Sequence, residues 1–170
     1  ILSFKYAHHF HRMTEWIAEE ADIRNIRMVL HVGDVVNHGA ESEEDWHNAE
    51  SALDLLYCKH IPLLVAAGNH DYDNLLKVDR SLSSFNKYFG CHRYQGKPWY
   101  GGEHSGSEGA NRYVRIEAEE GKWLFLALEF APRDEVLQWA DRVLEDHQDH
   151  RAIIVTHCYM NHDGELSRPG

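Results

Sequence analysis

The stretch IPLLVAAGNHD, residues 61–71, decides how the rest of the chain is interpreted. Its first part is short and apolar, which is typical of a strand buried in a parallel sheet. Asn69, His70 and Asp71 follow directly behind a glycine. A turn would account for the asparagine and the aspartate, because both side chains readily hydrogen-bond nearby backbone. A turn does not explain three polar side chains in a row after a buried strand, so the stretch also predicts a functional site.

An earlier segment has the same pattern of an apolar run, a glycine and then a polar residue. The run RMVLHV, residues 27–32, predicts a second buried strand, and it ends at a glycine followed by Asp34. The spacing of apolar residues predicts a helix before this strand, over residues 6–20. Ser42 is the expected N-cap of a helix after it. The order helix, strand, helix, strand predicts an α/β fold with a parallel sheet.

A third polar residue follows a third apolar run. The run AIIVT, residues 152–156, predicts another buried strand, and it ends at His157. Ligands of parallel sheets gather at the carboxyl ends of the strands. If the three strands share one sheet, Asp34, Asn69 and His157 meet at one edge. Carboxylate, amide and imidazole groups are ligands for Mn²⁺, Fe²⁺ or Zn²⁺, so the pattern predicts a divalent metal site.

Two neighbouring side chains have the chemistry to assist a reaction at such a site. His70 stands next to a predicted ligand and could protonate a leaving group. Asp71 could orient the His70 imidazole and favour its charged form. Each candidate also has a purely structural explanation: Asp34 could cap a turn, and His157 could be a buried histidine that is hydrogen-bonded internally.

Three other polar residues have open roles. Asn37 and His38 follow the first strand and could reach the substrate, although a loop role fits equally well. Glu129 follows the apolar run 123–128, where it could face a cleft. Capping of the next helix is the preferred interpretation of Glu129.

The composition narrows the class of protein. Apolar residues make up 43% and charged residues 26% of the 170 residues, as in soluble globular proteins. The net charge of −11 argues against a nucleic-acid-binding surface. No segment approaches the roughly 20 apolar residues that span a bilayer. The compartment and the oligomeric state do not follow from the sequence.

The three motifs GDVVNHG, GNHD and VTHCY, taken in this order, resemble successive blocks of the calcineurin-like metallophosphoesterase family. The resemblance implies a four-layer α/β/β/α sandwich and a pair of divalent metal ions. In that family, metal-activated water attacks the phosphorus of a phosphate mono- or diester. By the same resemblance, Asp34 would bridge both ions, and Asn69 and His157 would bind the second ion. His70 would protonate the leaving group, with Asp71 behind it.

Two blocks of the family pattern do not occur in residues 1–170. They are an early Asp-x-His/Gln block and a late Gly-His-x-His block, which carry the remaining metal ligands. We therefore expect residues 1–170 to be a single but incomplete domain, lacking the first strand and the C-terminal strands. The parent protein would be the enzyme, and this segment alone would be inactive. The alternative is a non-catalytic binding or assembly domain of the same fold with a degenerate metal site.

Overall fold

The computed structural model describes residues 6–39, 41–74, 80–107, 109–160 and 162–165. None of the helices in these ranges is long and apolar enough to cross a membrane. The elements are, in chain order, α1 (Ala7–Glu20), β1 (Val29–His31), α2 (Glu43–Cys58), β2 (Leu63–Val65), the 3₁₀ turn η2 (Asn69–Asp71), α3 (Ser83–Phe89), the 3₁₀ turn η3 (Cys91–Arg93), β3 (Tyr100–Glu103), β4 (Arg112–Ala118), β5 (Gly121–Leu128), α4 (Asp134–Asp146) and β6 (Arg151–Thr156).

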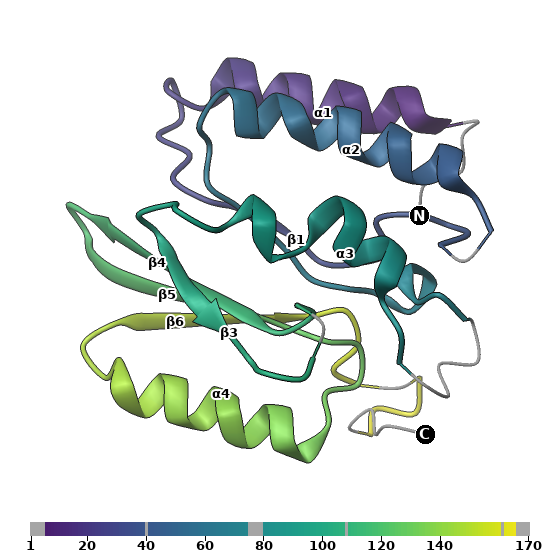
Figure 1. Cartoon of the computed structure of the whole chain (residues 1–170). Coiled ribbons are helices and arrows are strands. Elements are labelled where there is room, and N and C mark those ends of the chain that lie inside the picture. Colours follow the sequence, from purple (N-terminus) through teal and green to yellow (C-terminus); the bar gives the residue numbers. More distant parts are fainter. Residues whose placement is uncertain (1–5, 40, 75–79, 108, 161, 166–170) are drawn as a thin grey trace.

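These elements form four layers (Figure 1). Helices α1 and α2 lie side by side above the small parallel sheet of β1 and β2. Beneath this sheet lies a second one with the strand order β3-β4-β5-β6, and α4 covers its far face. In the second sheet, β5 and β6 are parallel and the other neighbours are antiparallel. The expected α/β/β/α sandwich is confirmed.

Apolar side chains fill each space between the layers, which explains why the layers stack. Alternate residues of β2 face opposite ways, so Leu63 and Val65 pack toward the helices while Leu64 packs toward the second sheet. The same alternation divides β5. Its Leu124 and Leu126 pack against α4, and its Phe125 packs between the two sheets.

The loop between β1 and α2 is fixed at the start of the helix. The Ser42 side chain accepts a hydrogen bond from the Asp45 amide at 3.2 Å, which confirms the predicted N-cap. One residue further on, the Trp46 indole N–H donates to the Gly39 carbonyl at 2.8 Å. The Trp46 ring is buried and stacks on Tyr88 of α3 with 5.6 Å between ring centroids. The helix therefore holds the loop by a cap, an indole and a packed ring.

One strand forms from residues that give little strand signal of their own. Residues 72–110 are rich in polar residues and glycine, yet Tyr100–Glu103 forms β3 and pairs with β4. The glycines allow this pairing to be close. A Cβ atom at Gly101 would lie 2.1 Å from the ring of Tyr113, so only glycine leaves room for the ring. Tertiary packing has overridden the low strand propensity of glycine here.

The prediction that all three strands with polar ends share one sheet is wrong. Strands β1 and β2 pair with each other, whereas β6 belongs to the second sheet. The prediction that residues 152–156 form a buried strand is wrong for most of the strand, because Ile153 is 37% exposed and Ile154 is 48% exposed, whereas Val155 is buried. Among the described strands, β6 pairs only with β5. It is therefore an edge strand with an uncovered apolar face.

Candidate metal centre

Asp34 lies in an unusual backbone conformation directly after β1. Its φ is 52° and that of Gly33 is 97°, so two consecutive residues occupy the left-handed region. For a residue with a side chain, this conformation costs on the order of 1–3 kcal/mol and persists only where the surroundings enforce it. The side chain is buried, with 7% exposure. Such strain at a buried carboxylate is typical of a functional site.

Two segments distant in the sequence contact the Asp34 carboxylate. The His70 amide donates to Asp34 Oδ1 at 3.0 Å, and this amide belongs to η2 after β2. The His157 Nε2 lies 3.3 Å from Asp34 Oδ2. The ends of β1, β2 and β6 therefore meet at one point, although β6 reaches it from the other sheet.

Two glycines make this approach possible. A Cβ atom at Gly68 would lie 2.2 Å from Asp34 Oδ1 and 2.1 Å from the Asp34 amide nitrogen. A Cβ atom at Gly33 would lie 2.8 Å from the Gly68 nitrogen and 3.0 Å from the His157 Cβ. Both glycines of the sequence motifs are therefore required by space, and Gly33 by its positive φ as well.

The His157 ring is oriented by a backbone carbonyl. Its Nδ1 lies 2.9 Å from the Val32 carbonyl oxygen, which can only accept, so Nδ1 carries the proton. In the neutral ring, Nε2 then presents a lone pair toward the Asp34 carboxylate. Two acceptors that face each other require a proton or a metal cation between them. Metal-binding histidines commonly donate their other ring N–H to a carbonyl in this way, so the pair fits a cation.

The pKa values of both groups reflect their contact. Burial would raise the pKa of Asp34, but hydrogen bonds from His157 and from the His70 amide leave it below its ordinary value. The hydrogen bond with Asp34 raises the pKa of His157 above its ordinary value, although burial opposes this. The site thus favours the charged carboxylate that a metal ion needs.

Asn69 is the third predicted ligand, and its placement is consistent with the prediction without completing the site. It is half-buried at the start of η2, next to the residue whose amide contacts Asp34. Among the described residues, no group of three or more His, Cys, Asp or Glu side chains is arranged to hold a metal ion. Asp34 and His157 are therefore a pair of donors, with the amide oxygen of Asn69 as the candidate third.

His70 has a different partner from the one the sequence suggested. Its Nδ1 lies 2.8 Å from the Asn37 carbonyl oxygen, so the ring donates to the loop after β1. The expectation that Asp71 orients this ring is corrected. Asn37 contributes through its backbone, which no side-chain pattern in the sequence could reveal. The remaining ring nitrogen of His70, Nε2, is the one that could exchange a proton with a substrate.

The Asp71 carboxylate instead joins the two loops that end β1 and β2. It is fully buried and accepts from the Gly68 amide at 2.7 Å and the Val36 amide at 3.1 Å. Burial raises the pKa of Asp71 to about 7, and the two amide donors act in the opposite direction. Asp71 therefore fixes the backbone around Asp34 rather than the ring of His70.

Asp71→Asn is expected to lower the free energy of unfolding by about 1–3 kcal/mol. The reason is that an asparagine must turn its NH₂ group toward one of two backbone N–H donors. Urea denaturation of the variant and the parent at neutral pH measures the difference. Asp141→Asn, at an exposed position of α4, is the control, and its urea midpoint should equal that of the parent. Equal midpoints for all three proteins would contradict this role of Asp71.

Glu129 connects the end of β5 to the segments around the site. Its side chain is 3% exposed and lies 2.8 Å from Arg133 Nε and 3.2 Å from Arg80 Nη1. It also accepts from the Asn111 side chain and, at the N-terminus of α4, from the Arg133 amide. Its backbone carbonyl accepts from Thr156, the residue before His157. The preferred capping role of Glu129 is corrected, because α4 has no side-chain cap hydrogen bond and the only described backbone amide that donates to Glu129 is that of Arg133, the residue before the helix.

Glu129→Gln is expected to cost about 1–3 kcal/mol of unfolding free energy at pH 7, because two arginines lose their counter-charge. Burial would raise the pKa of Glu129, but Arg133 and Asn111 lower it below the ordinary 4.5. Its contribution is therefore present above pH 4.5 and is lost as the pH falls through the lowered value. Chemical denaturation from pH 7 to pH 3 should show the two curves converging. A constant difference, or an equal loss in the exposed control Glu145→Gln, would contradict the prediction.

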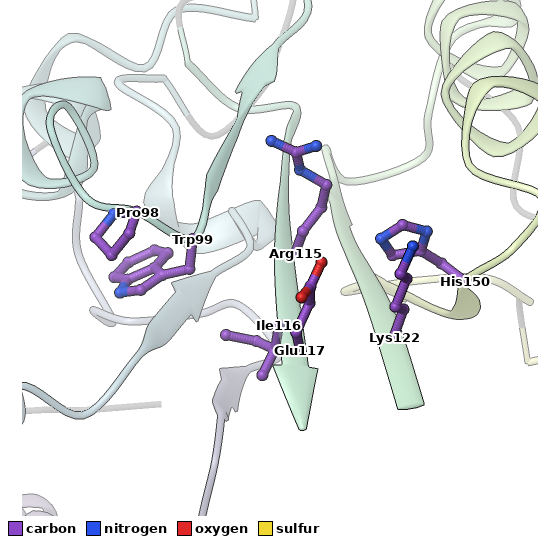
Figure 2. Close-up of a pocket in the computed structure, with 7 residues that line it drawn as sticks. All are labelled: Pro98, Trp99, Arg115, Ile116, Glu117, Lys122 and His150. Carbon is purple, nitrogen blue, oxygen red and sulfur yellow. The ribbon is translucent and has the colours of Figure 1, made fainter. Parts of the chain in front are cut away.

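A pocket of about 470 Å³ lies at the end of the second sheet that is far from the candidate metal centre (Figure 2). Arg115, Glu117, Lys122 and His150 are among the residues that line it. In the sheet register, Glu117 faces Lys122 near the start of β5, whereas Thr156 of β6 faces the end of β5. The pocket is therefore separate from the candidate metal centre, and it contains none of the predicted ligands.

Comparisons with known proteins agree with the fold. The family model for the calcineurin-like phosphoesterases matches residues 6–169. The chain is 34% identical over 165 residues to the uncharacterized protein YvnB of Bacillus subtilis strain 168. This match covers 97% of the chain but only 12% of YvnB. The chain thus corresponds to a small part of that relative.

Proposed function

The chain belongs to the calcineurin-like phosphoesterase family, and on that premise we propose that it contributes to the hydrolysis of a phosphoric ester at a centre of two divalent metal ions. Asp34, Asn69 and His157 would supply ligands from this chain. The observation that carries the proposal is the contact of 3.3 Å between Asp34 Oδ2 and His157 Nε2. Either a proton or a cation must occupy the space between these two acceptors.

The donor set suits Mn²⁺, Fe²⁺ or Zn²⁺, which accept oxygen and imidazole ligands together. Bound divalent cations would supply positive charge beside the phosphoryl group and make a water molecule more acidic. This charge matters in a chain with a net charge of −11, which otherwise repels an anionic ester. Asp34 is held ready for such ions by its buried, left-handed turn and by the His70 amide.

His70 is the candidate general acid for the leaving alcohol. The Asn37 carbonyl fixes its Nδ1–H, so a proton carried on Nε2 is free to be delivered. Its own amide contacts Asp34, so the imidazole is attached to the same short turn that meets the metal ligand. The turn would thereby fix the position of the His70 imidazole relative to a bound phosphoryl group.

His70→Asn tests the function through this acid. In the full-length protein supplied with Mn²⁺, kcat should fall about 100-fold for an alkyl phosphodiester. The loss should be smaller for a nitrophenyl ester, whose leaving group needs little protonation. Steady-state kinetics on both substrates measures the effect. His60→Asn is the matched control, because this histidine is exposed and asparagine tolerates its positive φ. Equal losses on both esters would contradict the proposed acid.

We propose that the remaining ligands of the two-metal centre come from other parts of a longer polypeptide, and that residues 1–170 form one incomplete domain of it. The coverage of only 12% of YvnB supports this proposal. The alternative is a non-catalytic binding domain, and it is favoured because the described residues bring together only two acidic or histidine donors, Asp34 and His157. Metal content separates the two, since an intact centre retains two Mn²⁺ per chain after dialysis and a degenerate one does not.

A further inference from the structure

The proposed mechanism gives no role to His31, although this histidine lies close to the candidate metal centre. It is the last residue of β1, three positions before Asp34. Its ring packs against Phe10 of α1, with 5.7 Å between ring centroids, and its Nδ1 lies 3.3 Å from the Gly33 amide nitrogen. The ring therefore contacts the turn that carries the predicted metal ligand.

The direction of this hydrogen bond fixes the state of the ring. A backbone N–H can only donate, so Nδ1 of His31 must be unprotonated and act as the acceptor. Burial lowers the pKa of His31 to about 4, so the ring is neutral and the acceptor is present at neutral pH. An apolar side chain of the same size would fill the space but would leave the Gly33 amide without this partner.

The Gly33 amide is part of the strained turn. Gly33 and Asp34 both have positive φ, and the turn directs the Asp34 carboxylate to His157 and to the His70 amide. A left-handed turn with a side chain at its second position needs support from its surroundings. Gly68 and the His70 amide support it from the side of β2. His31 supports it from the side of β1.

We infer that His31 is a positioning residue for the metal centre, which acts by accepting the Gly33 amide and so holding the turn that aims Asp34. The inference rests on the proposed function, because it concerns how tightly Asp34 and His157 bind a divalent cation. It predicts a role for the Nδ1 acceptor itself and not only for the volume of the ring.

The test compares three variants of the full-length protein by calorimetric titration with Mn²⁺ alone and by steady-state kinetics. His31→Leu fills the space without an acceptor, and its Mn²⁺ affinity should fall about 10-fold, as for other residues that orient ligands. Its kcat at saturating Mn²⁺ should stay near that of the parent. His31→Asn places an amide oxygen near the former Nδ1 position and should recover most of the affinity. Phe10→Leu loosens the packing of the same ring while Nδ1 remains, so it should lower thermal stability but not Mn²⁺ affinity.

Several results would overturn the inference. Unchanged Mn²⁺ affinity in His31→Leu would show that the acceptor does not matter. Equal weakening in His31→Asn and His31→Leu, or in Phe10→Leu, would show that only packing matters. If the parent binds Mn²⁺ and cleaves the ester, and His31→Leu has the same Mn²⁺ affinity as the parent, the inference fails while the proposed function stands. If the parent neither binds Mn²⁺ nor cleaves the ester, the proposed function fails and the inference with it.

Discussion

Asp34→Asn is expected to abolish phosphoester hydrolysis by the full-length protein, with a loss of more than about 100-fold. Residues that only orient a metal ligand already cost 10–100-fold when replaced, and Asp34 is the proposed ligand itself. The substitution removes the negative charge that faces His157 Nε2. It also places an NH₂ group where Oδ1 accepts from the His70 amide, or else where a cation is to bind.

The measurement is the hydrolysis of a chromogenic phosphodiester with Mn²⁺, together with the number of Mn²⁺ ions retained after dialysis. Both should fall in Asp34→Asn. The matched control is Asp54→Asn, which removes a partly exposed carboxylate that pairs with Arg93 on the surface of α2. It should hydrolyse the ester as the parent does. Retention of more than half of the parent's activity in Asp34→Asn would contradict the assignment of the centre.

Trp46→Ala is expected to have the largest effect on stability, about 3–5 kcal/mol of unfolding free energy. The ring is buried at 2% exposure among Phe85, Tyr88 and Phe89 of α3. Its removal leaves a large cavity and also deprives the Gly39 carbonyl of the indole donor. Since the Gly39 amide in turn donates to the His70 carbonyl, the loss reaches η2.

Urea denaturation with circular dichroism measures the loss. Trp46→Phe is the companion variant, because it keeps an aromatic ring but lacks the indole N–H, and it should lose clearly less than the alanine variant. Addition of Mn²⁺ should stabilise the parent more than Trp46→Ala, since the variant loosens the loop near the ligands. A loss below about 1 kcal/mol in Trp46→Ala would contradict the role of this ring in packing α2 against α3.

The features that follow from local sequence could be predicted. The N-cap of α2 was visible in Ser42 and the residues after it, because capping depends on a few neighbouring positions. The polar residues at strand ends were visible because an apolar run stops abruptly before them. The four layers were inferred only from the resemblance of three motifs, since periodicity alone does not specify how the sheets stack.

The features that depend on distant contacts could not be predicted. The strand Tyr100–Glu103 forms because β4 pairs with it, and its own glycines give no strand signal. His157 reaches Asp34 across two sheets, which no pattern within either segment specifies. The ring partner of His70 is a backbone carbonyl, and backbone groups are the same in every residue. On α4 the buried positions include Val136, whereas the neighbouring Leu137 is 45% exposed, and only the packing against β5 decides between them.

Asp34 and His157 follow strands of different sheets, so an ion at the proposed centre would have a second effect. A cation bound by both side chains would cross-link the two sheets, which enclose an apolar core between them. By thermodynamic reciprocity, a change that destabilises the packing between the sheets would lower the affinity for the ion, and binding of the ion would stabilise that packing. If the proposed centre binds an ion, substitutions between the sheets at a distance from Asp34, such as at Phe125, should therefore also lower the affinity for that ion.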